Sequence, residues 1–340
     1  MVLGAWNLIH VKYMNDRITL KHGEGTRASY ELIKEVFVKK VSNPFLDELG
    51  DAAAIGNLIY SCDSFIVNPI FFPSSDIGKL SIYGTVNDIC VSAGIPKYLS
   101  VAIIVEEGFF KKDLERIASS IKEAAKISKV NIVSGDFKVA DKGKVDKIFI
   151  STSGIGEKIP NRSSSFKNIK NGDKIIVTGS IGEHGISVML SRKKIFDFNI
   201  KSDCASLVNI VTPLWKTFKE IRFMRDPTRG GIASVLNEIY LGANKGLRIF
   251  EENIPVRKDV RATCEILGID PYYLASEGRA IIITSAESAN RVLRALKKKS
   301  APASIIGEVD EKIKGVVLDT VSGGERILDF SHSFNLPRIC

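Results

Sequence analysis

The sequence predicts an α/β protein built from two domains. In both halves of the chain, strand-like segments rich in β-branched and aromatic residues alternate with helix-like segments. A polar, serine-rich stretch with one proline and one glycine interrupts this alternation at residues 157–173, and we interpret it as the link between the domains. A chain of 340 residues is also long enough for two domains with a hydrophobic core each.

The first half combines several strands with one amphipathic helix. The expected strands cover residues 63–72, 98–107, 130–135 and 146–154. Residues 113–128 carry apolar side chains at helical spacing, and Asp113 is the expected N-cap. We therefore place the N-terminal domain over residues 18–165. Because Met14 offers a second start, residues 1–17 are treated as a candidate N-terminal extension.

The second half repeats the alternation and ends in a tail. Strands are expected over residues 173–180, 278–285, 303–309 and 315–320, and a helix with one apolar face starts near Ile232. This predicts a C-terminal α/β domain over residues 172–330. Residues 331–340 show no periodicity, and ten extended residues reach about 33 Å. We expect a flexible tail that can carry Cys340 into a distant pocket.

Composition excludes several functional classes. The formal net charge is +9, but the basic residues are dispersed rather than clustered with aromatic residues, so we expect no nucleic-acid partner. No apolar run is long enough for a membrane span, and the first residues lack the pattern of a signal peptide. The 5 cysteines form no CxxC pair, which argues against a zinc site or a disulfide framework. These features predict a cytoplasmic protein.

Two glycine-bearing loops precede helices and are candidate phosphate sites. In "MRDPTRGGIASVLNEIY", Asp226 and Arg229 stand before Gly230, and a glycine turn at a helix N-terminus offers free N–H groups to a phosphate. "KHGEGTRASYELIKEVF" places Gly23 and Gly25 before another amphipathic helix. An ordinary loop with a solvated salt bridge explains the first pattern equally well, and the second is not a Walker A sequence.

Isolated acids in apolar surroundings suggest a metal site. Carboxylates between hydrophobic neighbours are costly unless they are paired or bind a metal, and Mg²⁺ takes a few carboxylates together with phosphate oxygens. The candidates are Asp51, Asp63, Asp88 and Asp136. For each of them alone, a helix cap or a turn is an equally good explanation.

Two further residues are candidates for acid–base chemistry. Lys138 follows Asp136 by two positions, so in a strand both side chains lie on one face. Glu277 precedes a strongly apolar segment, where burial would raise its pKa enough for a general base. The alternative is that both are simply exposed at strand ends.

Together these motifs resemble the HypE family of hydrogenase maturation factors, the carbamoyl dehydratases. This family belongs to an ATP-binding superfamily with aminoimidazole ribonucleotide synthetase, selenophosphate synthetase and thiamine-phosphate kinase. The resemblance extends from about Ile18 to Cys340, and it rests on "HGEGTR", "GTVNDICVSAGIP", "GDFKVADKGKVDKIFI", "MRDPTRGGIASVLNEI", "SEGR" and, most specifically, the final "LPRIC".

The resemblance implies a synthetase-like fold and a homodimer in which strands of the N-terminal domains pair across the interface, with ATP bound nearby. Carried over by position, it implies ATP contacts from Gly23, Gly25, Asp51, Asp63, Asn87, Asp88, Asp136, Asp226, Arg229 and Gly230. The same transfer implies Mg²⁺ ligands at Asp51, Asp88, Asp136 and Asp226, and assigns Lys138 and Glu277 to work on the substrate.

The resemblance also implies a reaction on the last residue of the sequence. Cys340 would receive a carbamoyl group from a carbamoyltransferase partner, and ATP would drive loss of water to leave a thiocyanate. Its cyanide would pass through iron-carrying maturation scaffold proteins to the iron of a [NiFe] hydrogenase. Two alternatives remain: an ATP-dependent kinase or synthetase of the same superfamily that acts on a free small molecule, or a non-catalytic scaffold.

Overall fold

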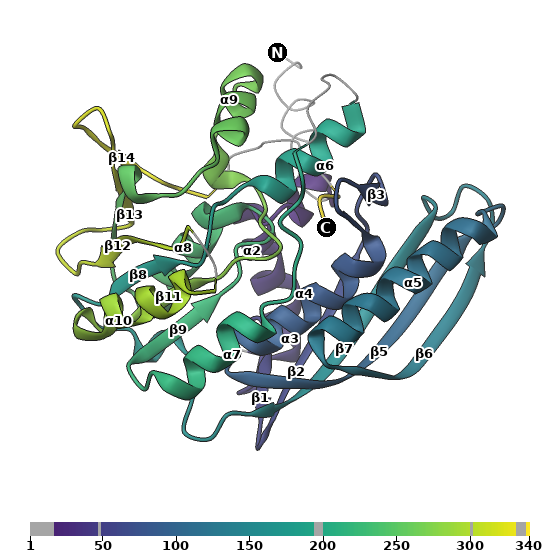
Figure 1. The fold of residues 1–340 in the computed structure, drawn as a ribbon, viewed down its shortest axis with the longest axis horizontal. Coiled ribbons are helices and arrows are strands. Elements are labelled where there is room, and N and C mark those ends of the chain that lie inside the picture. Colours follow the sequence, from purple (N-terminus) through teal and green to yellow (C-terminus); the bar gives the residue numbers. More distant parts are fainter. Residues whose placement is uncertain (1–16, 47–48, 194–199, 300–301, 331–337) are drawn as a thin grey trace, which may run out of the picture.

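The computed structural model describes residues 17–46, 49–193, 200–299, 302–330 and 338–340 (Figure 1). The candidate N-terminal extension therefore lies outside the described residues except for Arg17. The N-terminal helices are α2 Arg27–Leu32, α3 Lys39–Val41, α4 Ile77–Val91 and α5 Lys111–Ser128. The strands of this half are β1 Ala53–Ile55, β2 Leu58–Phe65, β3 Phe71–Phe72, β4 Ser75–Asp76, β5 Gly94–Glu106, β6 Asn131–Ala140 and β7 Ile148–Lys158.

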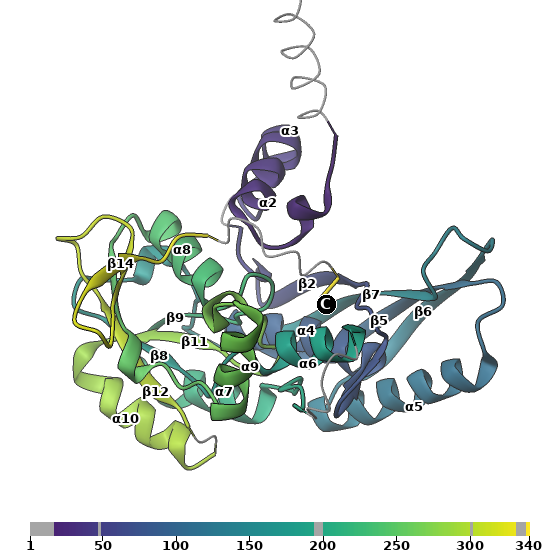
Figure 2. The ribbon, with the colours of Figure 1, turned by 90° about the horizontal axis from the view of Figure 1, so that it is seen from above.

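The N-terminal domain is built on a mixed sheet of five strands in the order β1-β2-β7-β5-β6. Only β5 and β6 pair in parallel, since α5 connects them, and the other neighbours are antiparallel. Helix α5 runs along one side of the sheet (Figure 2). Buried and less buried residues alternate along β2 and β7, which shows that this sheet has one covered face.

Two local predictions in this half are wrong. The strand expected over residues 63–72 begins earlier, as β2, and ends at Phe65. Pro69 has no N–H to donate to a ladder, and the chain bends at residues 68–70. Helix α5 begins at Lys111 after the N-cap residue Phe110, so Asp113 lies in the first turn, where its charge favours the helix dipole.

The C-terminal half forms a second sheet, of seven strands in the order β14-β13-β10-β12-β8-β11-β9. Its strands are β8 Lys174–Val177, β9 Ile221–Arg225, β10 Leu247–Phe250, β11 Ile281–Thr284, β12 Ser304–Val309, β13 Val316–Asp319 and β14 Glu325–Ile327. Its helices are α6 Glu183–Lys193, α7 Val208–Thr217, α8 Gly231–Ala243, α9 Lys258–Leu267 and α10 Ala286–Lys297. Helix α8 begins where the sequence places it.

The central strands of this second sheet are buried on both faces. Ile175 and Ile283 pack into the cluster that holds the apolar side of α8, whereas their neighbours Ile176 and Ile282 pack into the cluster that holds α7. Successive strand residues point to opposite faces, so this alternation places helices on both sides of the sheet.

The two halves share part of their core. The cluster that contains Ile176 and Trp215 also contains Phe65 and Val86 of the first domain. The indole Nε1–H of Trp215, on α7, donates to the carbonyl of Cys90, on α4, at 3.0 Å. The expectation of a separate core for each domain is therefore wrong on this side of the second sheet.

Across the described ranges, no helix combines the length and the apolar character that crossing a membrane requires.

Candidate active site between the two domains

Three of the predicted acids meet at the contact between the domains. Asp51 precedes β1, Asp88 lies near the end of α4, and Asp226 directly follows β9. One carboxylate oxygen of each lies within 4.8 Å of the others. The guanidinium of Arg225 contacts this group, with its Nε 2.8 Å from Asp51 Oδ1. Ser61, on β2, donates a hydrogen bond from Oγ to Asp88 Oδ2 at 2.8 Å.

The environment of these acids disfavours their charged form. Burial raises the pKa of Asp51 to about 6, and charge repulsion from Glu238 and Asp63 adds to the effect of burial. The pKa values of Asp88 and Asp226 are raised well above the usual range, first by burial and then by the neighbouring acids. One arginine cannot neutralise three carboxylates, so the set fits a divalent cation with oxygen ligands such as Mg²⁺.

The two predicted glycine loops contact each other. Gly25 has φ +67°, and a Cβ there would lie 2.4 Å from the carbonyl oxygen of Arg229. Gly230 has φ +76° and caps α8, and Ser234 Oγ donates to the Gly25 carbonyl at 2.6 Å. Only glycine combines this backbone conformation with this close approach. The glycines therefore join the N-terminal segment to α8, whereas Gly23 faces open space at the edge of a pocket.

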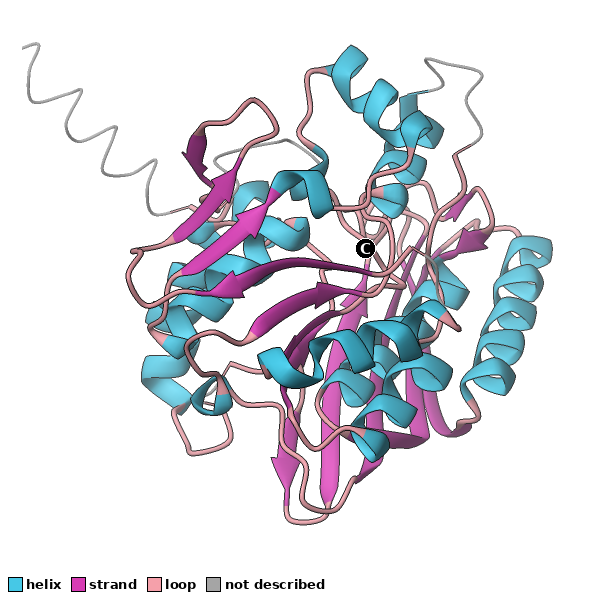
Figure 3. Cartoon of the chain, turned by 60° about the vertical axis from the view of Figure 1, so that its left-hand side comes forward, coloured by secondary structure: helices cyan, strands magenta, loops and turns pink. Residues whose placement is uncertain are grey.

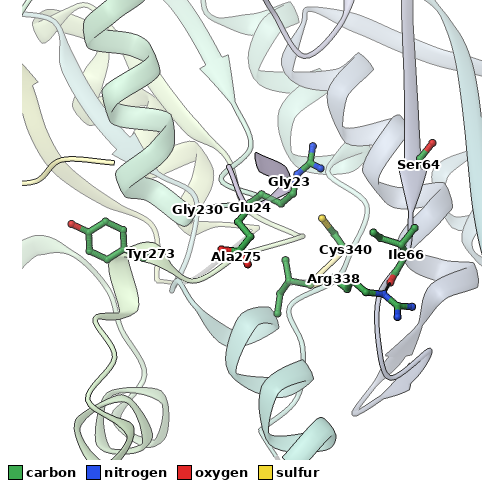
Figure 4. A pocket seen from close by; sticks show the side chains of 11 residues that line it. Gly23, Glu24, Ser64, Ile66, Gly230, Tyr273, Ala275, Arg338 and Cys340 are labelled. Carbon is green, nitrogen blue, oxygen red and sulfur yellow. Dashed lines mark hydrogen bonds between the residues drawn. The ribbon is translucent and has the colours of Figure 1, made fainter. Parts of the chain in front are cut away.

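A cavity of about 200 Å³ lies between the domains, and the end of the chain lines one side of it (Figure 4). Figure 3 shows the C-terminus between the two halves of the molecule. Residues of both domains and of the tail line it: Gly23, Glu24, Ser64, Ile66, Arg229, Gly230, Tyr273, Ala275, Arg338, Ile339 and Cys340. Residues 331–337 of the predicted flexible tail lie outside the described residues, but residues 338–340 are docked in this cavity. The sequence left the resting place of Cys340 open, and in the structure Cys340 lies in this cavity together with Gly23, Arg229 and Gly230.

The docked thiol lies among the charged groups of the site. Burial raises the pKa of Cys340 to about 12; Arg229 opposes this shift, and Glu277 and Asp63 add to it. The thiol is therefore protonated in this position at neutral pH, and Arg229 is the cationic group that interacts with Cys340.

Glu277 is a buried carboxyl group that interacts electrostatically with the Cys340 thiol, and it is a strong candidate for a base. Its side chain is 2% exposed, and its Oε1 has no hydrogen-bond partner within the described part of the chain. Burial, with repulsion from Asp203, raises the pKa of Glu277 to about 8. Asp203 Oδ1 also accepts the backbone N–H of Glu277 at 3.3 Å.

Asn87, predicted to contact ATP, has a different set of contacts in the structure. Its Nδ2 donates to the carbonyls of Ala205 and Glu277 at 3.0 and 3.1 Å, and its Oδ1 accepts from the N–H of Leu207 at 2.8 Å. The side chain is 1% exposed. Asn87 thus holds the Glu277 segment against α4. Asp63, on β2, accepts a hydrogen bond from Thr85 Oγ1 at 2.7 Å.

Asp136 and Lys138 stand apart from the other predicted residues. Both lie on β6, the open edge of the N-terminal sheet, and Lys138 Nζ is 2.5 Å from Asp136 Oδ1. Across the sheet, Asp136 is in register with Ala102 on β5, Ser151 on β7 and Ser64 on β2. Of these residues, only Ser64 lines the cavity. Three strand spacings separate Asp136 from Ser64, which is about 14 Å. Within one copy of the chain, this pair does not join the acid cluster.

Sequence reasoning missed two residues of the site. Arg225 neutralises part of the acid cluster, and its only signal was its place directly before Asp226. Asp203, which contacts Glu277, lies in the irregular segment before α7, where no motif marks it.

Comparisons with known proteins show the family of the chain. The sequence matches two models of the AIR synthase related protein family, the N-terminal domain over residues 49–157 and the C-terminal domain over residues 170–319. Carbamoyl dehydratase HypE of Azotobacter vinelandii is 40% identical over 334 residues, covering 96% of this chain and 98% of the relative.

Two solved structures are also similar. A HypE–HypF complex contains a chain that is 43% identical with a TM-score of 0.86, covering 88% of this chain and 99% of that one. The hydrogenase maturation protein HypE in complex with ATP is 40% identical with a TM-score of 0.81, covering 95% of this chain and 100% of the other. With this identity over nearly the whole length, the chain belongs to the HypE family of carbamoyl dehydratases, within the AIR synthase related superfamily.

Proposed function

We propose that this chain is an ATP-dependent carbamoyl dehydratase of [NiFe]-hydrogenase maturation that works on its own Cys340. The observation that carries this proposal is the position of the Cys340 thiol, which is docked in an interdomain cavity that Arg229 lines and whose electrostatics Glu277 influences. The family relationship and the solved HypE–ATP complex support the use of ATP. A kinase that acts on a free small molecule has no use for this thiol.

The chemistry requires the oxygen of a primary thiocarbamate to leave. Transfer of the γ-phosphoryl group of ATP to that oxygen makes it a leaving group and releases ADP. Removal of the nitrogen-bound protons then lets the C–O bond break, phosphate departs, and the C≡N bond of the thiocyanate forms. Glu277, with a pKa of about 8 and an unpartnered oxygen, is placed to accept a proton. Arg229 is placed to stabilise negative charge that develops beside the sulfur.

The acid cluster is the proposed place for the metal. Asp51, Asp88 and Asp226 would hold Mg²⁺, and the ion would supply positive charge to the phosphates of ATP. Asp136, the fourth predicted ligand, would have to come from another copy of the chain.

The raised pKa of the docked thiol favours a second position of the tail, outside the cavity, for loading. A docked thiol with a pKa of about 12 is a poor nucleophile, whereas a thiol in water has a pKa of ~8.5. Loading by a carbamoyltransferase is therefore expected outside the cavity. The carbamoylated sulfur is neutral, so returning it to the cavity does not bury a charge. The solved HypE–HypF complex supports the expectation that a partner protein visits a member of this family.

The test follows the mass of the peptide that contains Cys340. Incubation with the carbamoyltransferase and carbamoyl phosphate should add one carbamoyl group, and later addition of Mg²⁺–ATP should remove one water. A mass that never changes, although ATP is hydrolysed in the presence of a free small substrate, would instead favour the kinase alternative.

Asp226→Asn should separate stability from metal binding. In the metal-free protein the change removes one of three mutually repelling buried acids, so the melting temperature should rise or stay unchanged. The same change removes a ligand, so the affinity for Mg²⁺–ATP should fall by roughly tenfold or more, ~1.4 kcal/mol per factor of ten. Thermal melts in EDTA and nucleotide titrations with and without Mg²⁺ measure both effects. Unchanged Mg²⁺–ATP affinity would remove Asp226 from the metal site.

We also propose that the chain forms a homodimer through the N-terminal sheet. Apolar residues in register cross its outer face, as in the row Tyr60–Ile155–Tyr98, whose members are 41%, 39% and 49% exposed. β6 lies at an edge with no neighbouring strand in the described ranges, and its Val133 and Phe137 are 63% and 48% exposed, although the register with Ile103 places Phe137 on the opposite face from Tyr98. Open edges and large exposed apolar patches favour pairing with another chain. A second copy could also bring Asp136 and Lys138 to the site.

Tyr98→Lys tests the dimer, because it places a charge in the centre of the apolar row. Light scattering coupled to size exclusion should show a dimer for the unaltered protein and a mostly monomeric variant. Lys97→Glu, a charge change at the adjacent position, serves as the control and should leave the dimer intact. A monomeric unaltered protein would refute the proposal.

The proposed thiol chemistry also needs a reducing compartment, which fits the cytoplasmic location expected from the cysteines.

A further inference from the structure

Backbone oxygens of the three last residues of the docked tail accept hydrogen bonds from the rest of the protein. The carbonyl of Arg338 accepts from the N–H of Asn68 at 3.1 Å and from Arg192 Nη2 at 3.1 Å. A backbone carboxylate oxygen of Cys340 accepts from the N–H of Ile66 at 3.1 Å. Between them, the carbonyl of Ile339 lies 2.7 Å from Nε2 of His184. His184 thus binds the residue next to the reactive thiol.

His184 is built into this position. It is the second residue of α6, its side chain is fully buried, and its ring packs edge-on against Phe72 with 5.2 Å between centroids. Its other nitrogen, Nδ1, lies 2.9 Å from Ser202 Oγ, which itself accepts the N–H of Cys204 at 3.0 Å. Both ring nitrogens of this buried imidazole therefore have partners.

These partners determine the tautomer. A backbone carbonyl can only accept, so Nε2 must carry the proton that bonds to Ile339. Burial lowers the pKa of His184 to about 4, which leaves the ring neutral. Nδ1 then has a free lone pair and accepts from the hydroxyl of Ser202. The Ser202–His184 pair presents one fixed N–H donor to the tail.

The docked tail needs such a contact. Arg338 adopts φ +58°, a left-handed conformation that is unfavourable for a residue other than glycine. Ile339 is 6% exposed and packs into the shared core of the two domains. If the Ile339 carbonyl were buried without a hydrogen-bond donor, its desolvation would cancel a large part of the free energy that burial of the Ile339 side chain contributes to docking.

We propose that His184 is a positioning residue that latches the docked tail through the Ile339 carbonyl and thereby keeps the Cys340 sulfur in the cavity that Arg229 lines. It does not touch the reacting atoms. Its effect is on the fraction of molecules in which the tail lies inside the cavity.

The test measures how fast Cys340 reacts with N-ethylmaleimide in the full-length protein, with peptide mass spectrometry to resolve each cysteine. His184→Phe keeps a ring against Phe72 but removes the donor, so Cys340 should react about fivefold faster, the ratio that corresponds to a net hydrogen bond of ~1 kcal/mol at 1.4 kcal/mol per factor of ten. His184→Gln keeps an N–H donor and should react within about twofold of the unaltered protein.

The same digests report whether the variants are folded, because the buried Cys90 and Cys264 must stay unreactive. If they react in His184→Phe, His184→Met repeats the measurement, since its flexible side chain also lacks a donor and fills irregular space. An unchanged Cys340 rate in a folded donor-free variant, or equal rates in the Gln and Phe variants, would overturn the proposal.

A second readout rests on the proposed function. Transfer of the carbamoyl group to Cys340 should be as fast or faster in His184→Phe, because the tail is outside more often. The ATP-dependent loss of water should slow by about the same factor. The alkylation result stands whether or not the chain proves to be a dehydratase, so failure of the latch and failure of the proposed function can be told apart.

Discussion

Replacing Cys340 with alanine should abolish thiocyanate formation while Mg²⁺–ATP still binds with an affinity within about twofold of the unaltered protein. The acid cluster and the Gly25–Gly230 contact do not involve the thiol, so the nucleotide site should survive its loss. In the proposed reaction the sulfur carries both substrate and product. Mass spectrometry of the tail peptide and a nucleotide titration measure the two effects.

A matched control for this substitution is Cys62→Ala, which removes an exposed cysteine on β2 and should leave product formation intact. Product in Cys340→Ala would exclude Cys340 as the carrier. Loss of nucleotide binding in the same variant would show that Cys340 has a role in the ATP site itself.

Glu277→Gln should leave carbamoylation of Cys340 unaffected and slow the ATP-dependent loss of water by about 10²–10⁴-fold, the usual contribution of a general base. Glutamine has the same shape as glutamate, and Oε1 of Glu277 has no partner within the described residues that the change would break. Single-turnover rates on carbamoylated protein measure the effect, with the exposed Glu115→Gln on α5 as the control. An unchanged rate would remove Glu277 from the mechanism.

The pH dependence gives an independent check on the same residue. A base works only when it is deprotonated, and the pKa of Glu277 is raised from its usual value to about 8. The rate of water loss in the unaltered protein should therefore rise with pH through this region, and Glu277→Gln should lose that rise. Because repulsion from Asp203 contributes to the shift, Asp203→Asn should move the rise to lower pH.

Much of the candidate site could be predicted from the sequence because its parts are local. A glycine before a helix is visible as a pattern, and Gly25 and Gly230 occupy left-handed positions next to one another. Acids in apolar segments stand out as well, and Asp51, Asp88 and Asp226 converge. The family resemblance supplied the chemistry, which spacing alone left undecided between metal binding and ordinary turns.

Other contacts could not be predicted, because they depend on how distant segments pack. Asp203 and Ser202 lie in an irregular segment without periodicity, and their importance comes from what they contact, Glu277 and His184. Asn87 looked like part of an ATP motif, but its buried side chain holds backbone groups of the other domain.

By itself, the sequence determined the two α/β halves, the glycine loops, the acids and the reactive end of the chain, since each depends on residue type and short-range spacing. Tertiary structure decided which of these residues meet. The strand order places β6 at an edge, so Asp136 and Lys138 are separated from the acids that they were grouped with. The packing of α6 against the tail brings His184 into contact with Ile339. Neither arrangement could be predicted from a local pattern, because strand order and helix packing follow from the burial of the whole chain.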